Sequence, residues 1–330
     1  MQGAAFQSPA LTIALALAAG MIAQVLARHL RIPGIVLLLA SGVLLGPDGL
    51  GVVRPGTLGH SLHDLVGFAV AVILFDGGMN LNLGRLRREA RSIRQLVTAG
   101  AVVTAAGGAL AARWILGWDW TLAVLFGTLV IVTGPTVITP LLRRIKVKER
   151  VATVLEAEGV LGDAVGAIIA VVTLEVVLSP AGPSLATGAW DLASRLGFGA
   201  LLGAVAGLVL AALLRFQRLI PDGLESVFTL AAVVALFQGS NALMAESGIL
   251  SVIMAGLVVG NARAHVVNEL REFKEQLTIL LVGLLFVLLA ADIRLAEVYA
   301  LGWPGLFTVL ALMLLVRPAN VLVGTFGSEL

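Results

Sequence analysis

The residues of greatest chemical interest are ionisable side chains inside long apolar stretches: Asp76, Glu158, Asp163 and Arg317. Asp163 follows Arg150 by thirteen residues, which is roughly 20 Å along a helix axis. It is therefore expected near the middle of a membrane-spanning helix. A carboxylate at that depth is costly and is by default a functional candidate. It could bind a cation or a proton, or it could cap freed backbone amides in a structural role.

A break is expected in the stretch 121–142, which contains Thr133-Gly134-Pro135 and then Pro140. Proline lacks an amide hydrogen and leaves a carbonyl one turn earlier without its helical partner. Inside a membrane, such open backbone is tolerated only against protein or a water-filled cavity. Transporters use freed carbonyls of this kind to hold a cation. The alternative interpretation is a simple proline kink.

Small residues surround Asp163 at helical spacing. Gly159, Gly166 and Ala170 share its face, and Gly162 lies beside it. A face of small residues lets a second helix approach closely. We therefore expect the broken helix to pack against Asp163.

The remaining buried charges have different roles. Glu158 and Arg317 are expected at matching depths, and each alone would be costly, so they are predicted to form an ion pair. A structural role is favoured for this pair over a role in transport. Asp76 lies near the end of the stretch 62–82, where it could join a cation site or merely reach the membrane interface.

The composition explains why so few charges matter. The 330 residues are 59% hydrophobic and 13% charged, with 38 glycines and no cysteine, and the mean hydropathy is +1.02. A soluble domain carries about 25% charged residues. These values exclude disordered, collagenous and disulfide-framework classes, and a net charge of +2 excludes a nucleic-acid partner. The remaining class is a polytopic membrane protein.

Eleven stretches are long enough to cross a bilayer as helices, which takes about 20 residues. They are continuously apolar, unlike the alternating strands of a membrane barrel. They lie near 9–27, 34–50, 62–82, 95–116, 121–142, 151–178, 189–214, 224–242, 246–261, 276–292 and 300–323.

The basic residues predict the orientation. Residues 1–8 contain no basic residue, so the first stretch is not a cleaved signal peptide. Loops after odd-numbered helices hold 17 Lys and Arg, and loops after even-numbered helices hold 4 when Arg113 and Arg195, near the adjoining span ends, are included. This bias predicts an external N-terminus and cytoplasmic loops after odd-numbered helices. The clusters at 85–94 and 143–150 are interpreted mainly as topology signals, with lipid or partner binding as the alternative.

The chain contains an internal repeat. A shift of 214 residues superposes Gly34-Ile35, Gly42 and Gly46 on Gly248-Ile249, Gly256 and Gly260. The shift spans seven helices, an odd number, so the two copies face opposite ways, as in the inverted repeats of secondary transporters.

The repeat predicts one membrane transporter domain over 1–330. Its parts are a first repeat at about 9–178, a linker helix at about 189–214 and an incomplete second repeat at about 224–330. The copy of 95–178 would fall near 309–392, so two further helices are expected after Leu330. The predicted fold is thus an all-α polytopic membrane protein. It is an inverted-repeat transporter fold with a discontinuous fifth helix and eleven of thirteen transmembrane helices.

The sequence resembles the monovalent cation:proton antiporter superfamily, and most of all its first subfamily, the Na⁺/H⁺-exchanger-like proteins. The resemblance covers nearly the whole chain. Four segments carry it: Ile32-Pro33-Gly34 through Gly46-Pro47, Leu74-Phe75-Asp76-Gly77-Gly78-Met79-Asn80-Leu81, Thr133-Gly134-Pro135 followed by Leu141-Leu142-Arg143-Arg144, and Glu156-Ala157-Glu158-Gly159-Val160-Leu161-Gly162-Asp163.

The resemblance implies a thirteen-helix fold with a dimer domain and a core domain, and a homodimer in the cell (inner) membrane. By position, the resemblance implies that Asp163 is the transport aspartate and that Asp76 is an acidic residue near the ion. It makes Glu158 and Arg317 the core ion pair and Thr133 a backbone ligand.

Three positions depart from the family pattern. Gly162 stands where the family has Asn or Asp, Gly134 where it has Asp, and Gly159 where serine is common. The implied cation and proton site of Asp163, Asp76, Thr133, Gly134, Gly159 and Gly162 is therefore poor in side-chain ligands.

These features predict a secondary transporter that exchanges Na⁺ or K⁺ for H⁺, with Asp163 binding either ion, and so a part in pH homeostasis. One exchanging carboxylate predicts electroneutral exchange. No enzymatic motif is visible, and no cofactor is expected. A cytoplasmic regulatory domain beyond Leu330 is possible in principle. The alternatives are a cation channel or uniporter, a sodium-coupled organic anion symporter, and a non-transporting scaffold.

Overall fold

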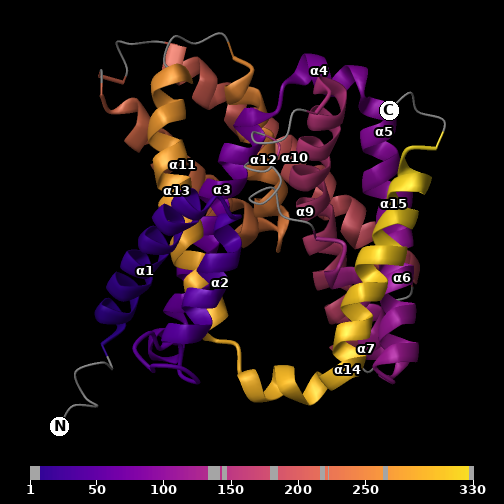
Figure 1. Cartoon of the computed structure of the whole chain (residues 1–330). Coiled ribbons are helices and arrows are strands. Elements are labelled where there is room, and N and C mark those ends of the chain that lie inside the picture. The colour runs from indigo at the N-terminus through magenta and orange to yellow at the C-terminus, as the bar shows by residue number, and fades with distance from the viewer. Residues whose placement is uncertain are drawn as a thin grey trace.

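The computed structural model describes residues 8–132, 142, 147–178, 185–215, 220–221, 223–262 and 267–326. Over these residues the chain is helical and contains no β-strand. Figure 1 shows the helices standing side by side, with short connecting helices at both ends.

The elements follow the apolar stretches of the sequence. The helices are α1 Pro9–Leu30, α2 Gly34–Leu45, α3 Ser61–Asn80, α4 Leu83–Arg88, α5 Ala90–Gln95, α6 Ala101–Ile115, α7 Trp120–Leu129, α9 Glu149–Leu178, α10 Leu185–Arg215, α11 Glu225–Leu243, α12 Ser247–Gly260, α13 Val267–Ala291, α14 Leu295–Ala311 and α15 Arg317–Gly324. Two π-helical segments, η3 Leu96–Gly100 and η4 Leu312–Val316, continue α5 into α6 and α14 into α15, and a short 3₁₀ segment, η2 Pro55–Leu58, precedes α3.

The described helices confirm the polytopic membrane fold. Seven of them, counting each π-interrupted run as one, are long and apolar enough to cross a membrane, and four shorter apolar helices lie among them. Together they correspond to the eleven predicted stretches. The hydrocarbon core of a bilayer is about 30 Å thick, and this thickness sets the minimum length of an apolar helix that crosses it. The spans can therefore be predicted from the local sequence alone.

Matching glycines of the two halves make matching contacts. A Cβ atom added to Gly42 of α2 would lie 2.6 Å from the carbonyl oxygen of Val287 on α13. The repeat-related Gly256 of α12 lies in the same way against the carbonyl oxygen of Phe75 on α3. The second helix of each half therefore packs, backbone to backbone, on the third helix of the other half.

The connections after these helices match as well. The amide of Leu295 donates to Asp48 Oδ2 at 2.6 Å, and the amide of Leu83 donates to Asn261 Oδ1 at 2.9 Å. Asp48 and Asn261 each come just after the second helix of one half. Each side chain accepts a hydrogen bond from the start of the segment that follows the third helix of the other half. Figure 1 shows the two halves inverted, since α3 ends at the top beside α4 and α13 ends at the bottom beside α14.

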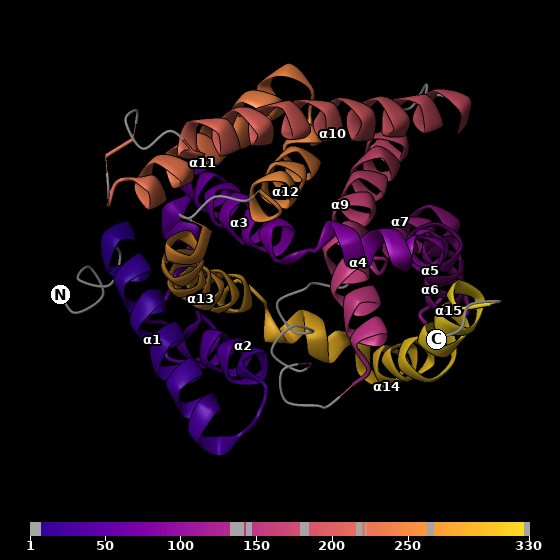
Figure 2. The same ribbon diagram turned by 90° about the horizontal axis from the view of Figure 1, so that it is seen from above.

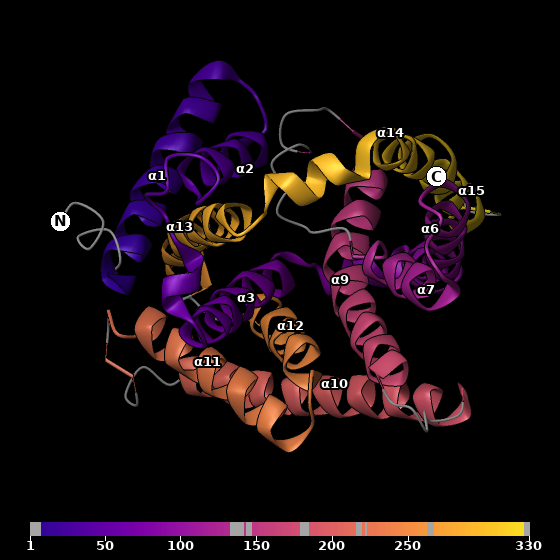
Figure 3. The same ribbon diagram turned by 90° about the horizontal axis from the view of Figure 1, so that it is seen from below.

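The helices form two groups in the views from above and below (Figures 2 and 3). One contains α1, α2, α3, α11, α12 and α13, and the other contains α5, α6, α7, α14 and α15. Helix α9 lies between them, and α10 runs along one side. Two segments cross between the groups, the connector α4 at one end of the bundle and the first turns of α14 at the other. Helix α14 bends at Gly302 (φ +50°), ahead of Pro304.

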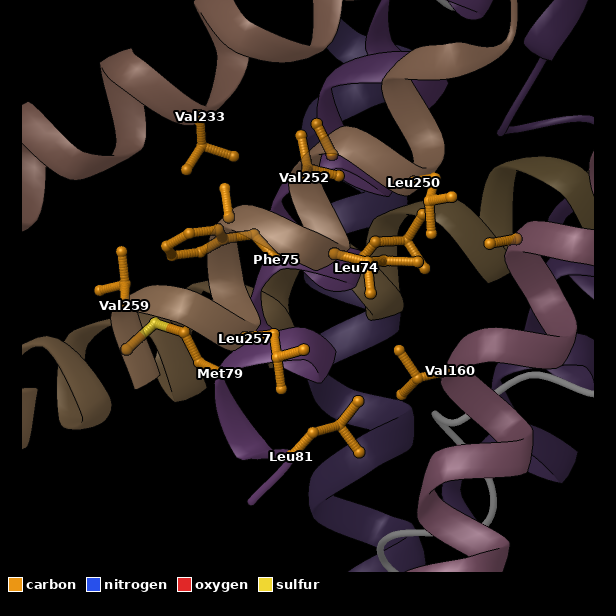
Figure 4. Close-up of a cluster of buried hydrophobic side chains, with 14 of the residues drawn as sticks. Leu74, Phe75, Met79, Leu81, Val160, Val233, Leu250, Val252, Leu257 and Val259 are labelled. Atoms are coloured by element: carbon orange, nitrogen blue, oxygen red, sulfur yellow. The ribbon is translucent and has the colours of Figure 1, made fainter. Parts of the chain in front are cut away.

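The buried core holds α9 against the first group. Leu74 and Phe75 of α3 gather with Val252 and Leu257 of α12, and Val160 of α9 reaches the same cluster (Figure 4). The glycines along α12 and α3 let these backbones approach closely, which is the usual way that helices associate in lipid.

The tryptophans and the arginine-rich connector follow spans of opposite parity in the chain. All five tryptophans follow even-numbered spans or lie at their ends: Trp114, Trp118, Trp120, Trp190 and Trp303. The arginine-rich connector α4 and α5 follows an odd-numbered span. Tryptophan rings favour the headgroup level and basic residues the cytoplasmic loops, so both patterns are consistent with one placement of the bundle across a bilayer.

Candidate ion-binding site

The site is built on α9, the helix that carries most of the predicted residues. Its 30 residues span about 45 Å, so Asp163, fourteen residues after the first, lies near its middle. The Asp163 side chain is half-buried, and the neighbouring Gly159 and Gly162 are buried. Protein therefore covers part of this carboxylate and leaves part of it accessible.

The backbone that follows α7 approaches α9 one turn from Asp163. A Cβ atom added to Gly166 would lie 3.0 Å from Val132 Cγ2 and 3.2 Å from the Val132 amide nitrogen. Helix α7 ends at Leu129, and the residues up to Val132 are no longer helical. The chain therefore leaves its helix beside the small-residue face of α9. The predicted ligands Thr133 and Gly134 come next and lie outside the described residues.

Asp76 lies on α3, which contacts α9 at about the level of Asp163. Gly77 is so close to α9 that an added Cβ atom would lie 3.2 Å from Val160 Cγ2. Asp76 itself is half-buried and accepts a hydrogen bond from Asn80 Nδ2 at 3.2 Å. The structure thus brings the helices of Asp76 and Asp163 into contact within one turn of both carboxylates.

Glu158 and Arg317 form a two-pronged ion pair. Arg317 Nη1 lies 3.0 Å from Glu158 Oε1, and Nη2 donates to Oε2 at 3.1 Å. Only 7% of the Glu158 side chain is exposed, against 36% of the Arg317 side chain. Arg317 directly follows η4, whose wider turn changes the direction of the residues after it. The pair joins α9 to α15 across 159 residues of sequence.

Two more ion pairs fix the start of α9. Arg150 Nε lies 2.7 Å from Glu89 Oε1, and Arg85 Nε lies 2.9 Å from Glu149 Oε1. Glu89, which separates α4 from α5, is buried, whereas both members of the Arg85 pair are exposed. The pair that includes the buried Glu89 is the stronger anchor, because fully exposed pairs contribute only about 0–1 kcal/mol.

The site has few carboxylates to offer a cation. Among the described residues, no three His, Cys, Asp or Glu side chains converge as metal ligands. The candidate ligands are the carboxylates of Asp163 and Asp76 together with backbone near Val132. Oxygen ligands of this kind suit a hard monovalent cation or a proton better than a transition metal.

Comparison with known proteins identifies the family of the chain. The family model for the transmembrane region of the sodium/hydrogen exchanger matches residues 13–330. The chain belongs to the sodium/hydrogen exchanger family. Members of this family are transporters.

Several relatives are similar to this chain over most of its length. A K⁺/H⁺ antiporter, NhaP2, of Shewanella oneidensis is 29% identical over 324 residues, which are 96% of this chain and 56% of that protein. The Na⁺/H⁺ antiporter 1 of Methanocaldococcus jannaschii is 28% identical over 334 residues, covering 96% of this chain and 76% of that protein. The structure of the sodium proton antiporter MjNhaP1 from the same organism, at pH 8, matches with a TM-score of 0.82 and 25% identity, covering 96% of this chain and 78% of that one. The chain spans about half the length of the NhaP2 relatives it matches.

One ion pair of this chain was not predicted from the sequence. Glu175, near the end of α9, is 47% exposed and pairs with Arg195 of α10, Oε2 to Nη2 at 2.8 Å. Arg195 lies ten residues into α10 rather than in a loop. The sequence signal was present, since a single arginine inside an apolar stretch requires a partner.

A helix cap was also missed. Asp119 caps α7, with Oδ2 accepting from the amides of Leu122 at 3.3 Å and Thr121 at 3.0 Å. The hydrogen bond from Leu122, followed by that from Thr121, lowers the pKa of Asp119 below its ordinary value. The cap therefore stabilises the fold above the ordinary carboxyl pKa, and this contribution is lost as pH falls through the lowered pKa.

Proposed function

We propose that this exchanger is a cation:proton antiporter that moves Na⁺ or K⁺ in one direction and H⁺ in the other. Asp163 binds either the proton or the cation, and the site opens to the two sides of the membrane in turn. The observation that carries this proposal is the approach of non-helical backbone at Val132 to Gly166, one turn from a half-buried aspartate. Backbone carbonyls beside one carboxylate are a suitable ligand set for a small cation.

The names of the relatives support exchange with either cation. The Shewanella oneidensis relative is a K⁺/H⁺ antiporter, and the Methanocaldococcus jannaschii relative is a Na⁺/H⁺ antiporter. In our proposal Thr133 and Gly134 supply backbone ligands, and Asp76 is a second acidic group near the ion. Glu158 and Arg317 hold α9 and α15 together and take no part in binding.

The proposed exchange is electroneutral. Gly162 next to Asp163 carries no charge, so a single carboxylate exchanges one proton for one cation. No net charge then crosses the membrane in a cycle. A membrane potential, worth about 2.3 kcal/mol per charge per 100 mV, should not change the rate.

Proteoliposomes test this function directly. We expect that adding Na⁺ or K⁺ outside vesicles with an acidic lumen raises the luminal pH, and that an imposed potential of about 100 mV leaves the rate unchanged. Current without proton movement would instead indicate a channel or uniporter. Sodium-dependent uptake of an organic anion without proton movement would indicate a symporter.

We also propose that the exchanger lies in the cell (inner) membrane with its N-terminus external. The repeats span about 9–178 and 224–330, on either side of the linker helix. Because the chain has no cysteine, single cysteines can report orientation. We expect an impermeant maleimide added to intact cells to label Ser61→Cys, before α3, and not Arg88→Cys, after it. Labelling of Arg88→Cys alone would reverse the orientation.

A further inference from the structure

An apolar groove with a basic rim opens where α4 and α5 meet α9, away from the candidate ion site. Its volume is about 340 Å³. We call it the arginine groove and define it by four apolar residues along its floor and two arginines at its rim: Leu86, Ile93, Val97, Leu161, Arg87 and Arg94. Leu161 is two residues from Asp163 on α9 and therefore about 200° around the helix from it.

The charges on the rim are not neutralised by the protein. Arg85 and Glu89, in the same connector, are engaged with Glu149 and Arg150. Across the ranges that the structure describes, neither Arg87 nor Arg94 forms a salt bridge, and both are exposed. Two guanidinium groups with free donors beside one groove fit an oxyanion, and phosphate is the anion that arginine binds best by two-pronged contact.

The groove extends from this charged rim into the apolar depth of the bundle. Leu161 lies twelve residues after Glu149, the first residue of α9, which is about 18 Å along the helix. Val97 belongs to η3 and follows Arg94 by three residues, farther from the polar end of the helix. The groove itself is thus apolar, and the exposed charges of Arg87 and Arg94 lie beside it.

We infer that the arginine groove binds an anionic phospholipid. The phosphate lies between Arg87 and Arg94, and an acyl chain follows Val97 and Leu161. Basic pockets between helices at the basic-loop side of a membrane protein are suited to such headgroups. A free phosphate would leave the apolar floor uncovered, and the headgroup of a zwitterionic lipid would add a positive charge beside the arginines.

Binding of defined lipids to the purified chain in detergent tests this inference. The probes are dioleoyl phosphatidylglycerol and dioleoyl phosphatidylcholine, counted as bound adducts by native mass spectrometry. We expect phosphatidylglycerol to be preferred. Arg87→Gln/Arg94→Gln should weaken its binding about 30-fold, because each basic residue near an anionic headgroup contributes roughly a factor of five.

Two controls separate the groove from general attraction. Arg88→Gln/Arg91→Gln removes the same charge from exposed arginines that do not line the groove, and should weaken binding by no more than about threefold. Ala90→Leu keeps every charge but fills the exposed wall of the groove, and should also weaken binding. Inorganic phosphate at the same concentration should not compete.

Three results would overturn the inference. Equal losses in the two double variants would indicate diffuse electrostatics, and unchanged binding in Ala90→Leu would exclude the groove. Displacement of the lipid by inorganic phosphate would indicate a simple anion site. Monodisperse elution of every variant verifies that the loss is not caused by unfolding.

Discussion

Replacement of Asp163 by asparagine is expected to reduce exchange to the rate of protein-free liposomes. The amide has nearly the shape of the carboxylate, so the packing around residue 163 is kept. It can neither release a proton nor offer a negative charge to a cation, so both halves of the exchange are lost. The measurement is cation-induced change of luminal pH in proteoliposomes at matched protein content.

A matched control lies on the same helix. Glu149→Gln makes the same chemical change at the start of α9, where the carboxylate is 66% exposed and pairs, among the described residues, with exposed Arg85. It should retain exchange, since the buried Glu89 of the other pair still holds the start of α9 and exposed pairs such as that of Glu149 contribute little. Full exchange in Asp163→Asn, with Glu149→Gln also active, would remove Asp163 from the mechanism.

The largest expected effect on stability comes from breaking the ion pair between Glu158 and Arg317. Arg317→Gln leaves Glu158, 7% exposed, as an uncompensated buried charge. Breaking a buried pair in this way costs about 3–5 kcal/mol, and the partial exposure of Arg317 places this case at the low end. We expect a clear fall in the thermal unfolding midpoint, followed by tryptophan fluorescence in detergent.

The double variant Glu158→Gln/Arg317→Gln distinguishes structure from transport. It removes both charges and keeps two groups that can hydrogen-bond, so its midpoint should recover much of the loss, and exchange should return with it. A double variant that is stable but inactive would mean that the pair takes part in transport itself.

Much of the architecture follows from the sequence because membrane insertion is governed locally. A stretch of about 20 apolar residues is sufficient to define a spanning helix, so the predicted spans agree with the described helices. The offset of 214 residues also predicts which helices correspond, and the contacts of Gly42 and Gly256 match that correspondence.

The partners of each helix were harder to predict. In a membrane, an apolar helix face can pack equally well against lipid acyl chains or against another helix. Hydropathy therefore does not identify which helix is its neighbour. This is why the pairing of Glu175 with Arg195 and the anchoring of α9 by Glu89 and Arg150 were not foreseen. Glu158 and Arg317 could be paired in advance only because each is too costly to bury alone.

By itself, the sequence determined that this protein crosses the membrane repeatedly, that its two halves are inverted copies, and that one aspartate lies near the middle of a spanning helix. These properties depend on the length of the apolar stretches, on the spacing of the repeated residues and on the position of the aspartate within its stretch. All three can be read along the chain without knowledge of tertiary contacts. Only the tertiary structure decided what surrounds that aspartate. The closeness of Val132 to Gly166, of Gly77 to Val160 and of Arg317 to Glu158 each joins segments far apart in the chain. Such contacts depend on how glycine-lined helix faces fit together in three dimensions.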